Sequence, residues 1–150
     1  MNLENLGYFG IFLAGAIPWF EAIGVVPVGI LFGLDPALTV IAASVGNIIT
    51  IALFAYAGDK IRNWVIERRR KKGIEPKAGR YEKAQKAFDK YGIFGMAALG
   101  PIIIGTQFAA AASVAAGVKP LKVTLYISVA MVLWAILIAW GMVALGISFV

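Results

Sequence analysis

The stretch that decides the fold is residues 18–27, PWFEAIGVVP, which interrupts a long apolar block. Its two prolines each remove a backbone donor, so no uninterrupted helix is expected to run through it. Glu21 places one carboxyl group in this break. In lipid, freed backbone groups and a charge are tolerated only where protein buries them or where they line a watery cavity. A helix breaker and an acid at the same depth therefore predict a functional site.

The composition indicates a membrane protein. The chain has 150 residues, which suits a single domain, and it is 61% hydrophobic and 15% charged; soluble domains are typically about 25% charged. Residues 59–90 carry 12 Lys/Arg against five Asp/Glu, a net charge of +7, and the remainder carries −1. One basic segment between apolar blocks is typical of a cytoplasmic loop facing anionic lipid headgroups. We expect no nucleic-acid partner, because nothing here predicts a soluble fold to carry such a patch.

The absent residue types exclude several chemistries. The chain has no Cys and no His, which excludes thiol chemistry, disulfides, haem ligation and the usual zinc sites, and removes the commonest general base. Neither paired Asp residues nor a Ser with a general base is present in the pattern that an intramembrane protease needs. We therefore expect a protein that is not an enzyme and binds no cofactor.

Four apolar blocks follow one another at 6–34, 36–58, 91–118 and 120–150, each longer than the roughly 20 residues needed to span a bilayer. Blocks 36–58 and 120–150 are predicted transmembrane helices, and Asp35 is the expected N-cap of the first. Blocks 6–34 and 91–118 carry Pro and Gly near their centres and are predicted to be broken. The basic segment 59–90 connects the halves.

The basic segment contains an apolar stripe at helical spacing, formed by Tyr81, Ala84, Phe88 and Tyr91. This stripe predicts an amphipathic helix with basic residues on or beside its other face. Such a helix either lies on the membrane surface or packs as solvated cytoplasmic structure on its own domain.

The two halves of the chain match at a nearly constant shift of 83 or 84 residues. The matching pairs are Tyr8 with Tyr91, Pro18 with Pro101, Gly33 with Gly117, Pro36 with Pro120 and Gly58 with Gly141. Each half is therefore predicted to be a broken block, a short turn with Pro, and a long helix.

Each broken block either crosses the membrane once with a kink or enters halfway and returns to the side it came from. In the re-entrant case Lys119 and Lys122 lie on the same side as the basic loop, whereas a crossing places them opposite. The positive-inside rule favours the re-entrant interpretation. Each half then crosses once, the halves are inverted and both termini face outside. The expected fold is thus an all-α integral membrane protein of two inverted repeats, each a re-entrant helical hairpin followed by a transmembrane helix, as in secondary transporters.

The motifs resemble those of the small multidrug export protein family. Residues 21–29, EAIGVVPVG, look like its first motif, and Gly46-Asn47 resembles its Gly-Asn pair. Gly100-Pro101 and Gly105-Thr106 resemble its second-half motifs. More distantly, both broken blocks resemble the re-entrant elements of the DedA superfamily of membrane proteins.

The resemblance implies a dimeric transporter of the inner membrane, and the DedA group is associated with proton-linked transport and with polyprenyl-phosphate lipids. Ile23 stands where the first motif usually carries Arg, and residues 105–107 lack the Arg of DedA members. Arg is the natural clamp for phosphate, so its absence argues against a phosphate-bearing lipid substrate.

The leading hypothesis is a proton- or cation-coupled secondary transporter of a small molecule or lipid, with Glu21 as the coupling group. The alternative is a membrane scaffold or assembly protein, in which Glu21 accepts hydrogen bonds from freed amides and the basic loop recruits lipid headgroups or a protein. The predicted substrate- or ion-binding residues are Glu21, Pro27, Asn47, Pro101, Thr106 and Gln107. The expected partners are membrane lipid and a second copy of the chain.

Overall fold

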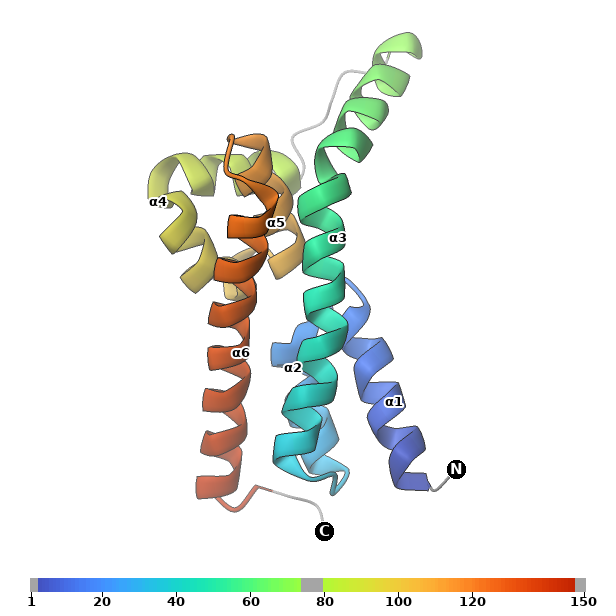
Figure 1. The fold of residues 1–150 in the computed structure, drawn as a ribbon, viewed down its shortest axis with the longest axis vertical. Helices are drawn as coiled ribbons and strands as arrows, with labels where there is room; N and C mark the ends of the chain where they lie inside the picture. Colours follow the sequence, from blue (N-terminus) through green and yellow to red (C-terminus); the bar gives the residue numbers. More distant parts are fainter. Residues whose placement is uncertain (1–2, 74–79, 148–150) are drawn as a thin grey trace. The chain divides into compact units, whose positions relative to one another are not determined.

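The computed structural model describes residues 3–73 and 80–147, and these residues form helices joined by short turns (Figure 1). The helices are α1 (Leu3–Ala16), α2 (Glu21–Leu31), α3 (Pro36–Lys71), α4 (Arg80–Ile103), α5 (Thr106–Ala115) and α6 (Pro120–Ala144). The prediction of an all-helical protein is confirmed. Both broken blocks are divided into two helices, at residues 17–20 and 104–105.

Packing divides the chain into two compact units, Met1–Thr50 with Ser128–Val150 and Ile51–Ile127. The first unit holds α1, α2, the beginning of α3 and the end of α6. The second holds α4, α5, the end of α3 and the beginning of α6. Each unit therefore contains one pair of shorter helices, the beginning of one long helix and the end of the other long helix.

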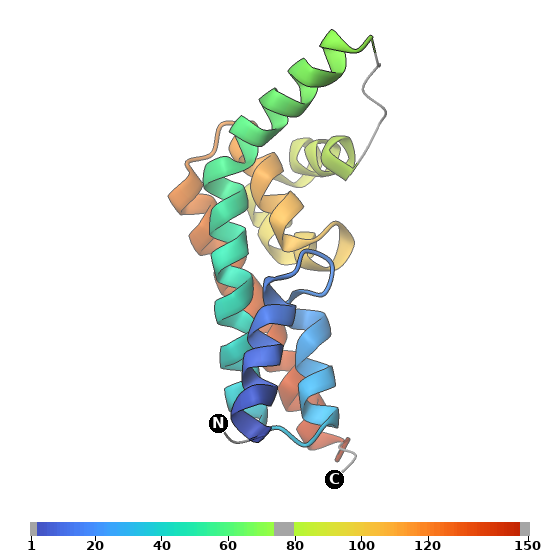
Figure 2. The same cartoon turned by 90° about the vertical axis from the view of Figure 1, so that its right-hand side faces the viewer.

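In the first unit, α1 and α2 form an antiparallel hairpin that packs on the beginning of α3 (Figure 2). The backbone N–H of Asp35 donates a hydrogen bond of 3.0 Å to the Tyr8 hydroxyl, so the hairpin starts and ends at the same end of the unit. Glycines permit close helix packing here: a β-carbon added to Gly15 would lie 2.5 Å from the carbonyl oxygen of Ala43.

In the second unit, α4 and α5 form the corresponding hairpin. Gly92, with φ 64° and ψ −169°, divides α4 into two helical parts. The ring centroids of Phe94 and Tyr126 are 5.5 Å apart, so the part of α4 that follows Gly92 begins beside the beginning of α6. Phe108 packs against Phe54 of α3, with ring centroids 6.0 Å apart. This hairpin also starts and ends at the same end of its unit.

The helix boundaries follow local rules that the two halves share. The Leu38 N–H donates to Asp35 Oδ1 at 2.9 Å, which confirms Asp35 as the N-cap of α3. Helices α2 and α5 both end in a Schellman motif, with Gly33 and Gly117 at φ 78° and 97°. These two glycines are one of the sequence pairs related by the shift of 84 residues, and both members of this pair have the same backbone conformation.

Three boundaries differ from the sequence prediction. Helix α6 ends at Ala144, short of residue 150, because Gly146 adopts φ 65° and its N–H bonds back to the carbonyl of Val143. Helix α2 continues through Pro27, so this proline removes one hydrogen bond without breaking the helix. The predicted loop 59–90 is helical over 59–71 and 80–90, since Lys, Arg and Glu are good helix formers.

The predicted amphipathic stripe is visible only in part. The side chains of Tyr81 and Ala84 lie outside the described residues. Of the other two members, Phe88 is half-buried and Tyr91 is exposed.

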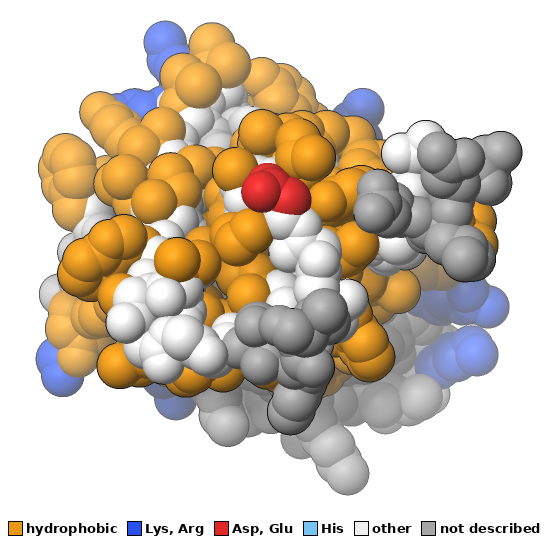
Figure 3. Space-filling model, turned by 90° about the horizontal axis from the view of Figure 1, so that it is seen from below, with side chains coloured by type: hydrophobic (Ala, Val, Ile, Leu, Met, Phe, Trp, Pro, Cys, Tyr) orange, Lys and Arg blue, Asp and Glu red, His pale blue; other side chains and the backbone are white. Residues whose placement is uncertain are grey.

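Two helices in the described part of the chain are long and apolar enough to cross a membrane, Pro36–Gly58 within α3 and Pro120–Ala144. Only 39% and 28% of their most apolar windows are buried, whereas the core helix of a soluble protein is mostly buried. Figure 3 shows hydrophobic side chains over much of the described surface in view. An apolar surface of this extent is suited to contact with lipid.

Candidate functional site

At the turn formed by residues 17–20, two aromatic side chains point outward and the acidic side chain that follows them is buried. Trp19 and Phe20 are exposed, whereas the next residue, Glu21, is only 6% exposed. Trp19 and Glu21 have positive φ values of 106° and 46°. Non-glycine residues rarely adopt this region, and such strain concentrates at functional sites. The backbone therefore holds a carboxyl group inside the unit at a conformational cost.

Glu21 is also the first residue of α2, where the helix favours negative charge. The first N–H groups of a helix have no partner within it, and the helix dipole places partial positive charge at this end. Glu21 makes a polar interaction in the structure and is not an isolated charge. Its position combines burial, a helix N-terminus and a break in the chain.

Helix register places Asn47 at the level of Glu21. Helices α2 and α3 are antiparallel and touch where Gly29 meets Thr39. Glu21 lies eight residues before Gly29 and Asn47 eight residues after Thr39, so each is about 12 Å along its helix axis from that contact. Asn47 is fully buried. Two of the predicted site residues thus lie at one depth within the first unit.

Two residues that the sequence prediction missed belong to the same region. Ser44 lies one helical turn from Asn47, and its buried Oγ has no hydrogen-bond partner among the described residues. Trp134 of α6 lies at the level of Glu21. Ile30 is nine residues after Glu21 and Val143 is nine residues after Trp134, and Ile30 and Val143 line the same cavity. The available signals were the Ser44-Asn47 spacing of one turn and an indole donor inside an apolar helix.

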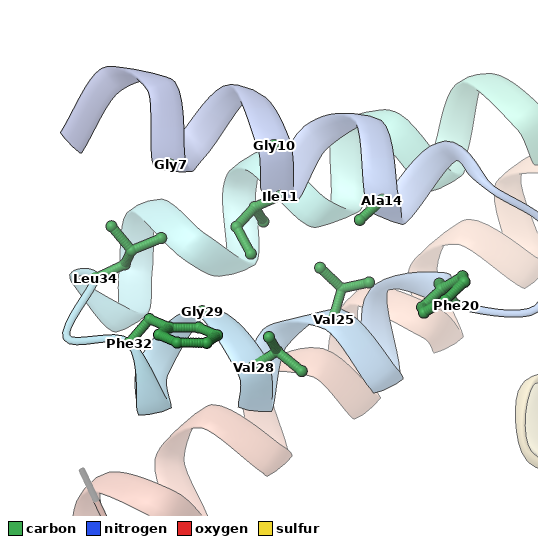
Figure 4. A pocket seen from close by; sticks show the side chains of 10 residues that line it. All are labelled: Gly7, Gly10, Ile11, Ala14, Phe20, Val25, Val28, Gly29, Phe32 and Leu34. Atoms are coloured by element: carbon green, nitrogen blue, oxygen red, sulfur yellow. The ribbon is translucent and has the colours of Figure 1, made fainter. Parts of the chain in front are cut away.

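A cavity of about 510 Å³ lies between α1 and α2 (Figure 4). It extends from Phe20, beside Glu21, to Leu34 at the other end of the hairpin, and Ile11 and Val25 line its middle. Gly7, Gly10 and Gly29 border it, and a β-carbon added to Gly10 would meet nothing within 4 Å. Its volume falls within the range of small-molecule sites, and its lining is apolar.

The remaining predicted residues lie in the second unit. Thr106 and Gln107 begin α5 and are fully buried, and Thr106 Oγ1 donates to Gln107 Oε1 at 3.1 Å. Pro101 is buried in α4, two residues before that helix ends. Pro27, the sixth predicted residue, is half-buried within α2 of the first unit.

The predicted shift between the halves pairs Glu21 with a residue at the other hairpin tip. Shifting Glu21 by 84 residues reaches Gly105, which has φ 96° and precedes α5. Both positions therefore have positive φ at the start of the second hairpin helix. One half has glycine there, which adopts this region readily, and the other half has a carboxylate, which does not. Glu21 therefore adopts a conformation that its residue type does not favour.

No cluster of three or more His, Cys, Asp or Glu side chains that would hold a metal ion occurs among the described residues. The first unit offers one buried carboxyl group with an amide and a hydroxyl nearby in register. A single carboxylate balances one positive charge, so this group suits a proton or a monovalent cation better than a multivalent metal.

A profile of the family described as "Putative small multi-drug export protein" matches residues 21–137, well over half of the chain. The comparison with curated proteins finds no match, and the comparison with solved structures finds none. Together with the two membrane-length helices, the family match identifies a membrane protein. The matched segment begins at Glu21 and includes both hairpin-to-helix turns. The chain belongs to the small multi-drug export protein family.

Proposed function

We propose that this protein is a secondary transporter of the inner (plasma) membrane that moves a small molecule or lipid in exchange for, or together with, a proton or cation carried by Glu21. The observation that carries the proposal is the buried Glu21 carboxyl at the break between α1 and α2. An ionisable group at membrane depth is costly and marks ion or substrate pathways. The family description points to the same class of function.

The hairpins support a re-entrant topology. In the first unit, Tyr8 bonds to Asp35 across the two ends of the hairpin. In the second, Phe94 contacts Tyr126, so Lys122 lies on the same end of the unit as Lys90. Basic residues gather on the cytoplasmic side, which is the arrangement expected if α4 and α5 enter and leave from that side.

The exchange of α3 and α6 between the units supports an inverted repeat. Each hairpin packs with the beginning of the long helix that follows it and with the end of the other long helix. Inverted repeats with broken helices that form the binding site near the midplane are a recurrent architecture of secondary transporters.

The cavity between α1 and α2 suggests the substrate class. An apolar lining with Glu21 next to its Phe20 end suits a small apolar molecule, including one that carries a positive charge. We further propose that a homodimer forms, since a second copy would shield from lipid the backbone groups freed at the breaks within the two hairpins.

Reconstituted transport tests this proposal. The protein is placed in proteoliposomes with an internal pH dye, and a panel of small apolar cations and neutral molecules is added outside. Wild-type protein should show substrate-evoked proton flux. Glu21→Gln should insert and fold yet lose that flux, because Gln keeps the shape and an acceptor but cannot carry the proton.

Asp35→Asn is the matched control, because it removes a carboxylate from the other end of the α1–α2 hairpin while Asn still caps α3. This variant should transport normally. Unchanged proton-coupled transport in Glu21→Gln would refute the role of the carboxyl. No transport by the wild-type protein of any compound in the panel would favour a scaffold or assembly role.

A further inference from the structure

Two lysines of the second unit each lie over the ring of a neighbouring tyrosine. Lys90 Nζ is 5.0 Å from the centroid of the Tyr91 ring, and Lys122 Nζ is 5.5 Å from that of Tyr126. Phe94 contacts Tyr126 with centroids 5.5 Å apart. These residues come from two helices, α4 and α6, and comprise two lysine–tyrosine pairs and Phe94, which contacts one of the tyrosines. We call these five residues the lysine–aromatic cluster.

The bend at Gly92 builds this cluster. Figure 1 shows α4 changing direction along its length, and the conformation of Gly92 is one that only glycine adopts readily. After the bend, the Tyr91 side chain lies over Gly95, where a β-carbon would collide with it. The bend thus separates the exposed Lys90 and Tyr91 from the apolar helix that follows.

The cluster lies at the height expected for a membrane–water boundary. Lys122 is the third residue of α6, a helix long enough to cross the membrane. Tyr side chains are enriched at that boundary, and Lys side chains reach from it toward water. Lys86 and Lys119 lie close by in sequence, and Asp89 is the single acid between residues 86 and 126.

The surface beside the cluster is apolar and exposed. Phe94 is 71% exposed, and Leu121 and Leu125 of α6 are also exposed. A positive, aromatic-lined patch that continues into an apolar surface matches a molecule with a negative head and a hydrocarbon tail. Neither a free phosphate ion nor a nucleic acid would use the apolar part.

We propose that the lysine–aromatic cluster binds the phosphate headgroup of an anionic phospholipid, with the acyl chains against Phe94 and Leu125. Lys90 and Lys122 neutralise the phosphate, and the Tyr91 and Tyr126 rings hold the two ammonium groups in place through cation–π contacts. The site is separate from Glu21 and does not depend on transport.

Lipid binding to the full-length protein tests the site. The protein in mild detergent is titrated with phosphatidylglycerol or phosphatidylcholine, and bound lipid is counted by native mass spectrometry. Wild-type protein should retain phosphatidylglycerol preferentially. The double variant Lys90→Gln/Lys122→Gln should bind phosphatidylglycerol more weakly by about fivefold for each lysine, the effect typical of one basic residue near an anionic surface.

The control Lys60→Gln/Lys72→Gln removes two exposed lysines of the same unit outside the cluster and should keep wild-type affinity. Lys122→Arg, which keeps the charge, should retain binding. Equal losses in the two double variants, or equal binding of the two lipids by the wild-type protein, would overturn the proposal. Displacement of phosphatidylglycerol by inorganic phosphate at similar concentration would show that the phosphate alone is recognised and would overturn the assignment to lipid.

Discussion

Because Glu21 has a positive φ, we expect the order of stability of its Ala and Gly variants to be opposite to the order at most helical positions. At most helical positions alanine is more stable than glycine by up to about 1 kcal/mol. At Glu21, with φ 46°, alanine would retain a left-handed conformation that costs about 1–2 kcal/mol, and glycine would not. Glycine has a more flexible unfolded state, which offsets about 0.4–1 kcal/mol of that gain. We therefore expect Glu21→Gly to be more stable than Glu21→Ala by about 0.5–1 kcal/mol.

The comparison uses unfolding in mixed micelles, followed by far-UV circular dichroism, with both variants measured under the same conditions. Gly24 is the matched control, because it lies in the same helix and a β-carbon there would meet nothing within 4 Å. Gly24→Ala should stabilise the protein, so the preference between Gly and Ala should reverse over three residues. Equal stability of Glu21→Ala and Glu21→Gly would show that the carboxyl is not held by a strained backbone.

Three further predictions concern packing, topology and assembly. Gly46→Ala should destabilise the protein by about 1–3 kcal/mol, because its β-carbon would collide with the carbonyl oxygen of Phe12. The control Gly10→Ala should not destabilise it, because a β-carbon there meets nothing within 4 Å. Unfolding in mixed micelles measures both variants, and equal effects would contradict the close packing of α1 on α3. A cysteine at Asn2 should react with an impermeant thiol reagent from outside the cell and one at Lys71 should not; labelling at Asn2 only after the cells are opened would favour single kinked crossings. Native mass measurement in mild detergent should show two copies of the chain, and a monomer with full transport activity would refute the dimer.

Much of the fold could be predicted because the decisive signals are local. The α3 start depends on Asp35 and Pro36, and the ends of α2 and α5 depend on Gly33 and Gly117. These residues act within one turn of the chain, so sequence alone was sufficient. Apolar length similarly predicted both membrane-length helices.

The parts that could not be predicted depend on tertiary packing. Pro27 remains helical because the loss of one hydrogen bond did not outweigh the packing of α2, a balance that the sequence does not display. Nothing in the residue type marks Glu21 as left-handed, since the preference of Glu is for ordinary helix. That Trp134 lies at the same level as Glu21 follows only from the way α2 and α6 pack side by side.

The most direct test of the central claim asks whether the Glu21 carboxyl binds a proton within the membrane. Dicyclohexylcarbodiimide partitions into lipid and reacts with protonated carboxyl groups, so mass spectrometry of the treated protein locates any such group. We predict one adduct, on the peptide that contains Glu21 and absent from Glu21→Gln, forming more slowly as the pH rises because the reactive protonated form is lost. The exposed Asp35 should remain unmodified. Absence of the adduct from Glu21, or a labelling rate that does not change between mildly acidic and neutral pH, would contradict the claim that this carboxyl carries a proton.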